Sequence, residues 1–239
     1  MTNPLILKLE QRDQLSAEER RILEGTTSRI KEFRPNEDIV REGETMEFSC
    51  LLLEGWTSRN KTLANGRHAI TALHVLGDFV DLHSLLLRPM DQTVTAITPC
   101  RMALVPHEFL REITRDHPHL ARMLWLSTLI DAAIHRQWLF AMGQLSSAGQ
   151  LAHLICELYL RLQSVGQAKD LSFTFPITQV LLADVLGISP VHVNRTVQEL
   201  RRENLITWTG ALIRIEDWDR LSKSADFDPA YLNLSKVPR

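Results

Sequence analysis

The chain has 239 residues, of which 44% are hydrophobic and 23% are charged. This is the composition of a soluble globular protein and excludes a disordered or fibrous chain. The length predicts one or two domains. The formal net charge is -2, so the chain does not coat nucleic acid or an anionic membrane by charge alone, and any nucleic-acid contact has to be local.

The three cysteines, Cys50, Cys100 and Cys156, are widely spaced and form no Cys-x-x-Cys pair. Their odd number and spacing argue against a disulfide framework and against a metal site. The first residues contain a short apolar patch without a basic leader, and the apolar stretch 123–134 is interrupted by polar residues. These features predict a cytoplasmic protein.

Ser16 and Glu19 have the spacing of a capping box, in which each side chain binds the other's backbone amide, so a short helix is expected to begin at Ser16. From residue 33 to 106, apolar runs alternate with turn signals at spacings of about ten residues. Asn65-Gly66 is the strongest turn signal, because a type I′ hairpin turn needs positive φ at both central positions. This pattern predicts a compact β-barrel or sandwich.

Between Pro118 and Gly143 the apolar period becomes that of a long helix with two apolar faces. We interpret one face as a seam that meets the same helix of a second copy. This dimer interface consists of Met123, Leu126, Ile130, Ala133, Gln137 and Phe140. The second face is expected to pack on the β domain and consists of Leu120, Leu124, Ile134 and Trp138. A single buried core helix is the alternative. Another helix is predicted over 147–163, and a polar connection over 164–171.

A helix-turn-helix pattern follows. Thr178 can cap a helix over 179–186, Gly187 interrupts it, and a second helix begins with Ser189 as the N-cap and Pro190 at the first helical position. Ala183 is small where two helices cross, and Val193 is apolar where the second helix returns to the first. The run 205–208, a turn at Thr209-Gly210 and the run 211–215 predict a hairpin, which makes the unit a winged helix.

In the second helix, the inner face is expected to hold Val193, Val197 and Leu200, which leaves a polar outer face that can enter a major groove. Arg195 suits guanine, Asn194 or Gln198 suits adenine, and apolar Val191 suits a thymine methyl group. The predicted DNA-contacting set is Thr178, Gln179, Ser189, Val191, His192, Asn194, Arg195, Gln198 and Arg202. An ordinary helical pair with a solvated polar face is the alternative.

With these motifs the chain resembles the Crp/Fnr transcription regulators over about residues 20 to 220. The resemblance rests on the order of elements, on Gly43-Glu44, Gly55 and Gly77-Asp78-Phe79, and above all on the run Ile188 to Arg195. It implies an α+β fold with a cyclic-nucleotide-binding-like β-barrel over 1–116, a dimerisation helix and hinge over 117–146, and a winged helix-turn-helix over 147–239. It further implies a bacterial homodimer on a near-palindromic DNA site that contacts RNA polymerase.

Family members that bind cyclic AMP supply an arginine and a serine to the cyclic phosphate. Here the corresponding positions are Gln92 and Thr93, with Asp91 before them, so a phosphodiester meets no arginine and a carboxylate of the wrong sign. His135 and Arg136 stand where the long helix would meet the adenine. We therefore expect an effector other than cyclic AMP. The predicted effector pocket consists of Gly77, Asp78, Phe79, Gln92, Thr93, His135 and Arg136.

Family members with an iron-sulfur cluster hold it with cysteines near the N-terminus, and this chain has none before Cys50. Haem stays open, because His68, His74, His83 and His135 lie in the sensory half. A redox role for Cys100 or Cys156 stays open beside a structural one.

The sequence contains no nucleophile elbow, no phosphate-binding glycine loop and no metal-spaced cluster, so it does not predict an enzyme. The alternative function is a protein-interaction module that does not bind DNA, which the mixed charges of Glu199, Arg201 and their neighbours leave open.

Overall fold

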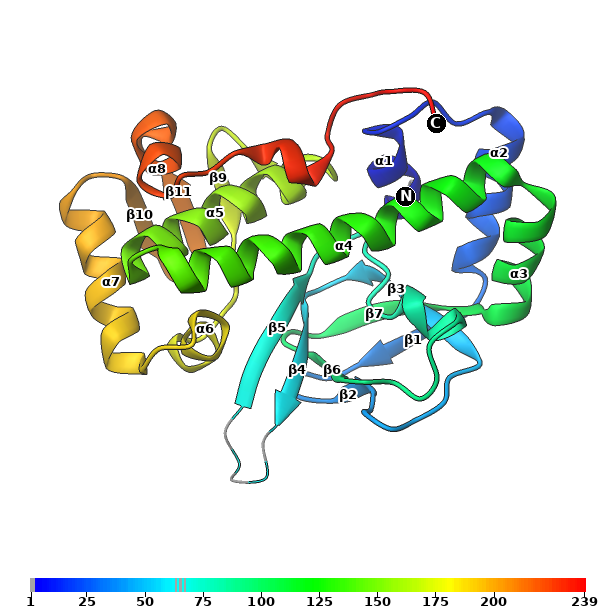
Figure 1. Ribbon diagram of the computed structural model, residues 1–239, viewed down its shortest axis with the longest axis horizontal. Coiled ribbons are helices and arrows are strands. Elements are labelled where there is room, and N and C mark those ends of the chain that lie inside the picture. Colours follow the sequence, from blue (N-terminus) through cyan, green and yellow to red (C-terminus); the bar gives the residue numbers. More distant parts are fainter. Residues whose placement is uncertain (1–2, 63, 65, 67) are drawn as a thin grey trace. The chain divides into compact units, whose positions relative to one another are not determined.

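The computed structural model describes residues 3–62, 64, 66 and 68–239 (Figure 1). The chain divides into two compact units, and each is described by itself. The first comprises residues 1–61, 71–131 and 234–239, and the second comprises residues 62–70 and 132–233. These units differ from the predicted boundaries, since the last six residues group with the N-terminal unit and the long helix is divided between the two. No helix among the described residues has the length and apolar character needed to cross a membrane.

The first unit begins with two capped helices. Asn3 caps α1 (Pro4–Glu10), and Ser16 with Glu19 forms the predicted capping box at the start of α2 (Ala17–Glu24). The core shared with the sheet includes Leu5, Ile6 and Leu9 of α1 and Leu23 of α2. Both caps satisfy backbone amides that the first helical turn leaves without partners.

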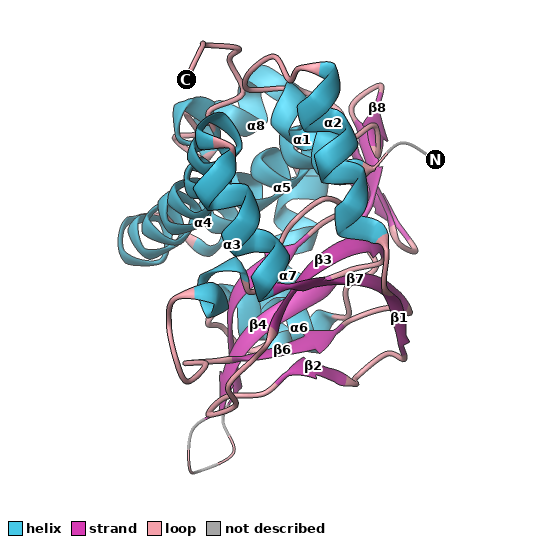
Figure 2. Cartoon of the chain, turned by 90° about the vertical axis from the view of Figure 1, so that its right-hand side faces the viewer, coloured by secondary structure: helices cyan, strands magenta, loops and turns pink. Residues whose placement is uncertain are grey.

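The β region consists of two sheets and not of a closed barrel (Figure 2). One sheet has the order β1-β7-β3, and the other has the order β2-β6-β4-β5. The strands are β1 (Ile30–Phe33), β2 (Asp38–Val40), β3 (Phe48–Glu54), β4 (Thr57–Thr62), β5 (His68–His74), β6 (Thr93–Ala96) and β7 (Cys100–Pro106). Among the neighbouring pairs whose register is given, all are antiparallel. Asn65 of the predicted Asn65-Gly66 turn lies outside the described residues.

Alternate side chains of β3 pack into two different hydrophobic cores. Leu51 faces a cluster formed with the helices, whereas Cys50 and Leu52 face the second sheet, because successive strand residues point to opposite faces. On β7, Val105 joins the first cluster and Leu104 joins the second. Both faces of this sheet are therefore buried, which explains the continuous apolar run in its sequence.

Two helices follow the sheets, α3 (His107–Asp116) and α4 (Pro118–Gln144). Leu120 and Leu124 of α4 enter the core of the first unit, as the pattern predicts. The predicted dimer seam needs a correction: Met123 is fully buried in the same core and Ile130 is 7% exposed. Phe140 of the predicted seam is exposed, and the other exposed apolar residues of α4 lie mainly on a neighbouring face, namely Trp125, Leu129, Leu139 and Met142. Two apolar faces could be read from the sequence, but their exact rotation could not.

The second unit contains α5 (Ser147–Gln163), the helix-turn-helix and a small sheet. This sheet has four strands in the order β10-β11-β9-β8, where the sequence predicted only a two-stranded hairpin. The strands are β8 (Ala168–Lys169), β9 (Ser172–Thr174), β10 (Ile206–Thr209) and β11 (Leu212–Ile215). The predicted polar connection over 164–171 thus contains a strand. The unit continues with α8 (Trp218–Ser224) and a short 3-10 helix, Pro229–Leu232.

Candidate nucleic-acid interface and sensory site

The helix-turn-helix consists of α6 (Gln179–Leu186) and α7 (Pro190–Arg202). Gly187 ends α6 in the left-handed region, with φ of +65°, where a residue with a Cβ is strained. Ser189 then caps α7, and Pro190 occupies its first position. The bounds of α6 and the start of α7 are those that the local signals predict.

The contact between α6 and α7 is made by small and apolar side chains. Ala183 of α6 and Val193, Thr196 and Leu200 of α7 are buried. Val197, which the sequence placed on the inner face, is only half-buried. The hydroxyl of Thr196 donates to the carbonyl of His192 at 3.0 Å, which satisfies its polar group inside the contact. The recognition helix is therefore rotated slightly from the predicted register.

The outer face of α7 is polar and exposed. Val191, which is apolar, is 66% exposed there, and four polar residues are also exposed, namely Asn194, Arg195, Gln198 and Arg202. No hydrogen bond or ion pair joins the side chains of these four to any described residue, and the alternative pair of Arg195 with Glu199 does not form. Their donors are consequently available to an external partner.

The remaining predicted contact residues surround the helix starts. The hydroxyl oxygen of Thr178 accepts from the amide of Leu181 at 3.2 Å, and that of Ser189 accepts from the amide of His192 at 3.3 Å. Gln179 and His192 are exposed. The two caps hold the helix starts while their hydroxyl protons can still be donated to a phosphate.

A hollow of about 270 Å³ lies between the start of α6, α7 and the β10–β11 hairpin. No carboxylate is among its described lining residues, and Arg201 is its charged side chain. The guanidinium of Arg201 donates to the carbonyl of Trp208 in β10, and the ring of Trp208 stacks on Phe175 with 5.8 Å between centroids. Neither Arg201 nor Trp208 was among the predicted DNA-contacting residues, because their roles depend on how the hairpin folds back.

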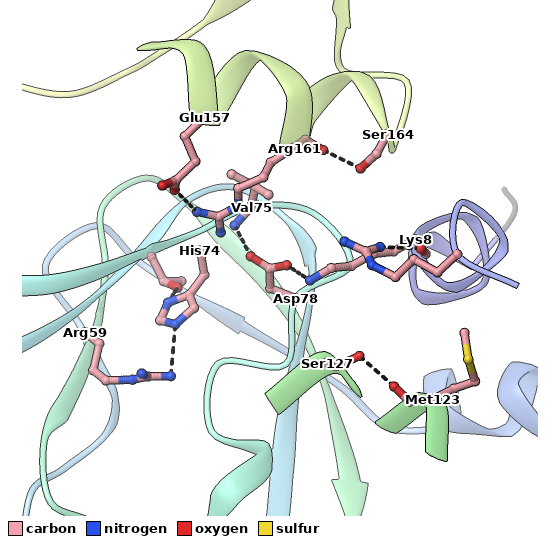
Figure 3. Close-up of polar contacts among 12 residues, drawn as sticks. Lys8, Arg59, His74, Val75, Asp78, Met123, Ser127, Glu157, Arg161 and Ser164 are labelled. Atoms are coloured by element: carbon pink, nitrogen blue, oxygen red, sulfur yellow. Dashed lines mark hydrogen bonds and ion pairs between the residues drawn. The ribbon is translucent and has the colours of Figure 1, made fainter. Parts of the chain in front are cut away.

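The sensory half carries the glycine and acid of the predicted effector pocket. Gly77 has φ of +82°, and a Cβ there would lie 2.7 Å from the carbonyl oxygen of Pro4, so no larger residue fits. The carboxylate of Asp78 forms an ion pair with Lys8 and accepts from the amide of Val75 at 2.9 Å (Figure 3). Asp78 thus joins its own loop to α1.

The other predicted pocket residues are also engaged or lie elsewhere. The side-chain carbonyl of Gln92 accepts from the hydroxyl of Thr71, and the hydroxyl of Thr93 accepts from the amide of Glu42 at 3.1 Å. Phe79 forms an isolated bridge with Leu51. His135 and Arg136 belong to the second unit. Within the first unit, the structure brings together Gly77, Asp78 and Phe79 as one segment.

Arg59 of β4 lies next to that segment and was missed by the sequence analysis. Its side chain is 5% exposed, and its guanidinium donates to the carbonyl of Val80 at 3.0 Å and to Nε2 of His74 at 3.3 Å (Figure 3). A guanidinium only donates, so Nδ1 of His74 carries the proton that binds Thr57, 3.0 Å away. The signal was present in the polar run of β4, whose residues 57–60 are all buried.

The other terminal nitrogen of the Arg59 guanidinium forms an ion pair with Asp131 of α4, at 3.0 Å. The fully buried Asp81 interacts electrostatically with Arg59. Its carboxylate accepts a hydrogen bond from the amide of Cys50 at 2.5 Å. Burial raises the pKa of Asp81 to about 7, against the weaker opposing effects of these hydrogen bonds and of Arg59. Arg59 and Asp81 therefore form a buried polar centre inside a unit whose core is otherwise largely apolar.

The cysteines are buried, and burial raises the pKa of each thiol, that of Cys156 to about 12. A thiol with a raised pKa forms little of the reactive thiolate at neutral pH. Among the described residues, no group of three or more His, Cys, Asp or Glu side chains is arranged to hold a metal ion.

Two family models match the chain. Residues 30–117 match "Cyclic nucleotide-binding domain", and residues 149–224 match "Crp-like helix-turn-helix domain". Both models together cover the sensory half and the DNA-binding half in the predicted order. The chain belongs to the Crp/Fnr family of transcription regulators. The predicted α+β fold is thereby confirmed, with the sheets in place of a closed barrel.

Relatives of this Crp/Fnr family member are named as regulators. The chain is 26% identical over 215 residues to the transcriptional activator protein FnrL of Cereibacter sphaeroides, covering 85% of this chain and 84% of FnrL. It is 26% identical over 193 residues to the nitrogen fixation regulation protein FixK of Bradyrhizobium diazoefficiens, covering 80% and 79%. The solved structure of FixK2 from Bradyrhizobium japonicum superimposes with a TM-score of 0.72 at 22% identity, covering 82% and 96%. These relatives are regulators, not enzymes.

Proposed function

We propose that this Crp/Fnr family member is a transcription regulator that binds a specific DNA sequence through α7. The observation that carries the proposal is the exposed polar face of α7, where Asn194, Arg195, Gln198 and Arg202 have no partner among the described residues. Side chains already committed to internal ion pairs could not read base edges without losing them. Two guanidinium groups and two amides that are free to donate can instead hold bases in a major groove.

The protein acts as a homodimer in this proposal. The exposed face of α4 with Trp125 at 65% and Leu129 at 49% exposure presents apolar surface that water solvates poorly. Pairing two copies along this face buries that surface and sets two recognition helices one turn of DNA apart, on a near-palindromic site. Family membership favours contact of the bound dimer with RNA polymerase. We expect it to act in the cytoplasm, where its three cysteines stay reduced.

The proposal includes an effector other than cyclic AMP, or none. Gln92 accepts a hydrogen bond from Thr71, and Asp91 beside it is exposed and acidic, so neither side chain offers a cyclic phosphate a cationic donor. The nearby ammonium of Lys61 is engaged by Glu42 and by the carbonyl of Asp91. Iron-sulfur and haem cofactors are not required for any contact of the proposed interface. Titration with cyclic AMP in a calorimeter is expected to give no saturable heat, and micromolar binding would refute this part of the proposal.

Selection of bound sequences from random DNA with the purified full chain tests the main proposal. We expect a near-palindromic consensus whose affinity falls steeply with salt, because phosphate contacts release counterions. Binding without sequence preference, or no binding at all, would support the alternative of a protein-interaction module. A matched control replaces Asn194, Arg195 and Gln198 together by alanine, which leaves the buried face of α7 unchanged.

A further inference from the structure

Arg59 connects the interior of the sensory sheet to α4. Its guanidinium contacts three segments of the first unit: His74 at the end of β5, the carbonyl of Val80 and the carboxylate of Asp131. Arg59 is 5% exposed, whereas the Asp131 side chain is 36% exposed. The buried end of this ion pair is therefore fixed by the sheet, and the other end belongs to the helix.

Asp131 lies at a decisive position along α4. Leu129, two residues before it, is on the exposed apolar face, and Ile130 between them is 7% exposed. Each helical residue advances the side-chain direction by about 100°, so the pair with Arg59, together with the buried Leu120, Met123 and Leu124, sets the rotation of α4 about its axis. That rotation decides whether Leu129 or Ile130 is presented to a second copy.

The contact is also energetically hard to replace. The buried guanidinium of Arg59 loses its hydration, and Asp131 supplies the carboxylate that pairs with it. Without the Asp131 carboxylate, the guanidinium keeps neutral acceptors and the electrostatic attraction of Asp81, so the helix must shift or water must enter to solvate it. The backbone carbonyl of Val80 and the ring of His74 accept hydrogen bonds but carry no formal negative charge.

We propose that Arg59 is a positioning residue of this regulator, which holds α4 in its dimerising rotation through Asp131. It supplies from within the chain the contact between sheet and helix that an effector could otherwise make. The inference rests on the proposed function, because it concerns the helix face through which the regulator is proposed to dimerise. It assigns the control of that face to a pair of charged residues of the chain itself.

The test compares dimerisation of the full-length wild type with three variants by sedimentation. Asp131→Asn removes the negative charge at nearly constant shape and is expected to weaken the dimer about tenfold or more, within the usual range of coupling between sites. Asp131→Glu keeps the charge and is expected to restore most of the affinity. Glu54→Gln is the matched control, because Glu54 forms an exposed ion pair with Arg101 between the neighbouring strands β3 and β7. DNA affinity at low protein concentration is expected to follow the dimer in each variant.

A merely structural role predicts a different pattern. If Asp131→Asn lowers the melting temperature but leaves the dimer dissociation constant within twofold of the wild type, the proposal is overturned. If Asp131→Asn does not fold, Arg59→Met combined with Asp131→Leu removes both charges and fills the space. That folded double variant is expected to dimerise more weakly, since an apolar contact has no fixed direction, and a wild-type dimer would equally overturn the proposal. If the wild type dimerises but selects no DNA sequence, the proposed function is refuted, while the effect of Asp131 on dimerisation can still be measured.

Discussion

The indole of Trp138 donates a hydrogen bond to the carboxylate of Glu157 at 3.0 Å, where both side chains are buried in the second unit. The same carboxylate accepts from the hydroxyl of Tyr231 at 3.1 Å and from Arg161 at 2.8 Å. A fully buried carboxylate with three donors is stable because all of its oxygens are satisfied. Glu157 thereby joins the second half of α4 to α5 and to the 3-10 helix near the C-terminus.

Glu157→Ala is expected to destabilise the protein by about 3 to 5 kcal/mol, because it leaves the buried cation and two donors without an acceptor. Glu157→Gln keeps the shape and one acceptor oxygen, and is expected to cost less. Chemical denaturation measures both. A loss below 1 kcal/mol for the alanine variant would show that water replaces the carboxylate without cost.

A second prediction concerns pH. The pKa of Asp81 is raised from 3.8 to about 7 by burial, so folding favours its protonated form. Its contribution to stability is therefore fully present below pH 3.8 and is lost as the pH rises through about 7. The shift corresponds to about 4 kcal/mol at most. Asp81→Asn removes this titration and is expected to gain stability over the wild type at pH 8 but not at pH 4.

Thermal unfolding at both pH values checks the second prediction, with Asp170→Asn as a control at an 85% exposed side chain. The asparagine retains the oxygen that accepts from the amide of Cys50. If the stability difference between Asp81→Asn and the wild type is the same at pH 4 and pH 8, the carboxyl of Asp81 does not titrate with the raised pKa.

The third prediction concerns the face of α4. Leu129→Glu is expected to produce folded monomers, because it places a charge on the exposed apolar face where a partner would bury it, at a cost of several kcal/mol. Ile130→Glu is expected to destabilise the monomer itself, since Ile130 is only 7% exposed. Sedimentation and circular dichroism separate the two effects. Leu86→Glu, at an 85% exposed residue outside α4, is the control. A dimer that survives Leu129→Glu would place the interface elsewhere.

Features of the fold that depend on neighbouring residues could be predicted from the sequence, whereas features that depend on distant segments could not. The caps at Ser16, Thr178 and Ser189 and the left-handed Gly187 are local signals, and they predicted the helix bounds correctly. The rotation of α4 and the centre at Arg59 depend on contacts between distant segments, such as the 72 residues that separate Arg59 from Asp131. A polar run in a strand signals burial only once its neighbours are known.

The last prediction assigns base reading to Arg195. Its guanidinium is exposed on α7, one turn into the helix, and has no partner among the described residues, so it can donate two parallel hydrogen bonds to a guanine. Arg195→Ala is expected to cost about 1 to 3 kcal/mol per half-site, concentrated at one symmetric pair of G·C positions. Thr178→Ala, which removes a helix cap and a phosphate donor, is expected to weaken all sequences similarly.

Competition binding against every single-base variant of the selected site measures these effects. Arg34→Ala, which removes an exposed charge from the first unit, controls for the change in net charge. A solvated Arg195 that only pairs weakly with Glu199 would contribute about 0.2 to 0.5 kcal/mol to the helix and nothing to base preference. If Arg195→Ala keeps the wild-type preference at every position, Arg195 contacts no base, and the reading residues must be sought among Asn194, Gln198 and Val191 on the same exposed face.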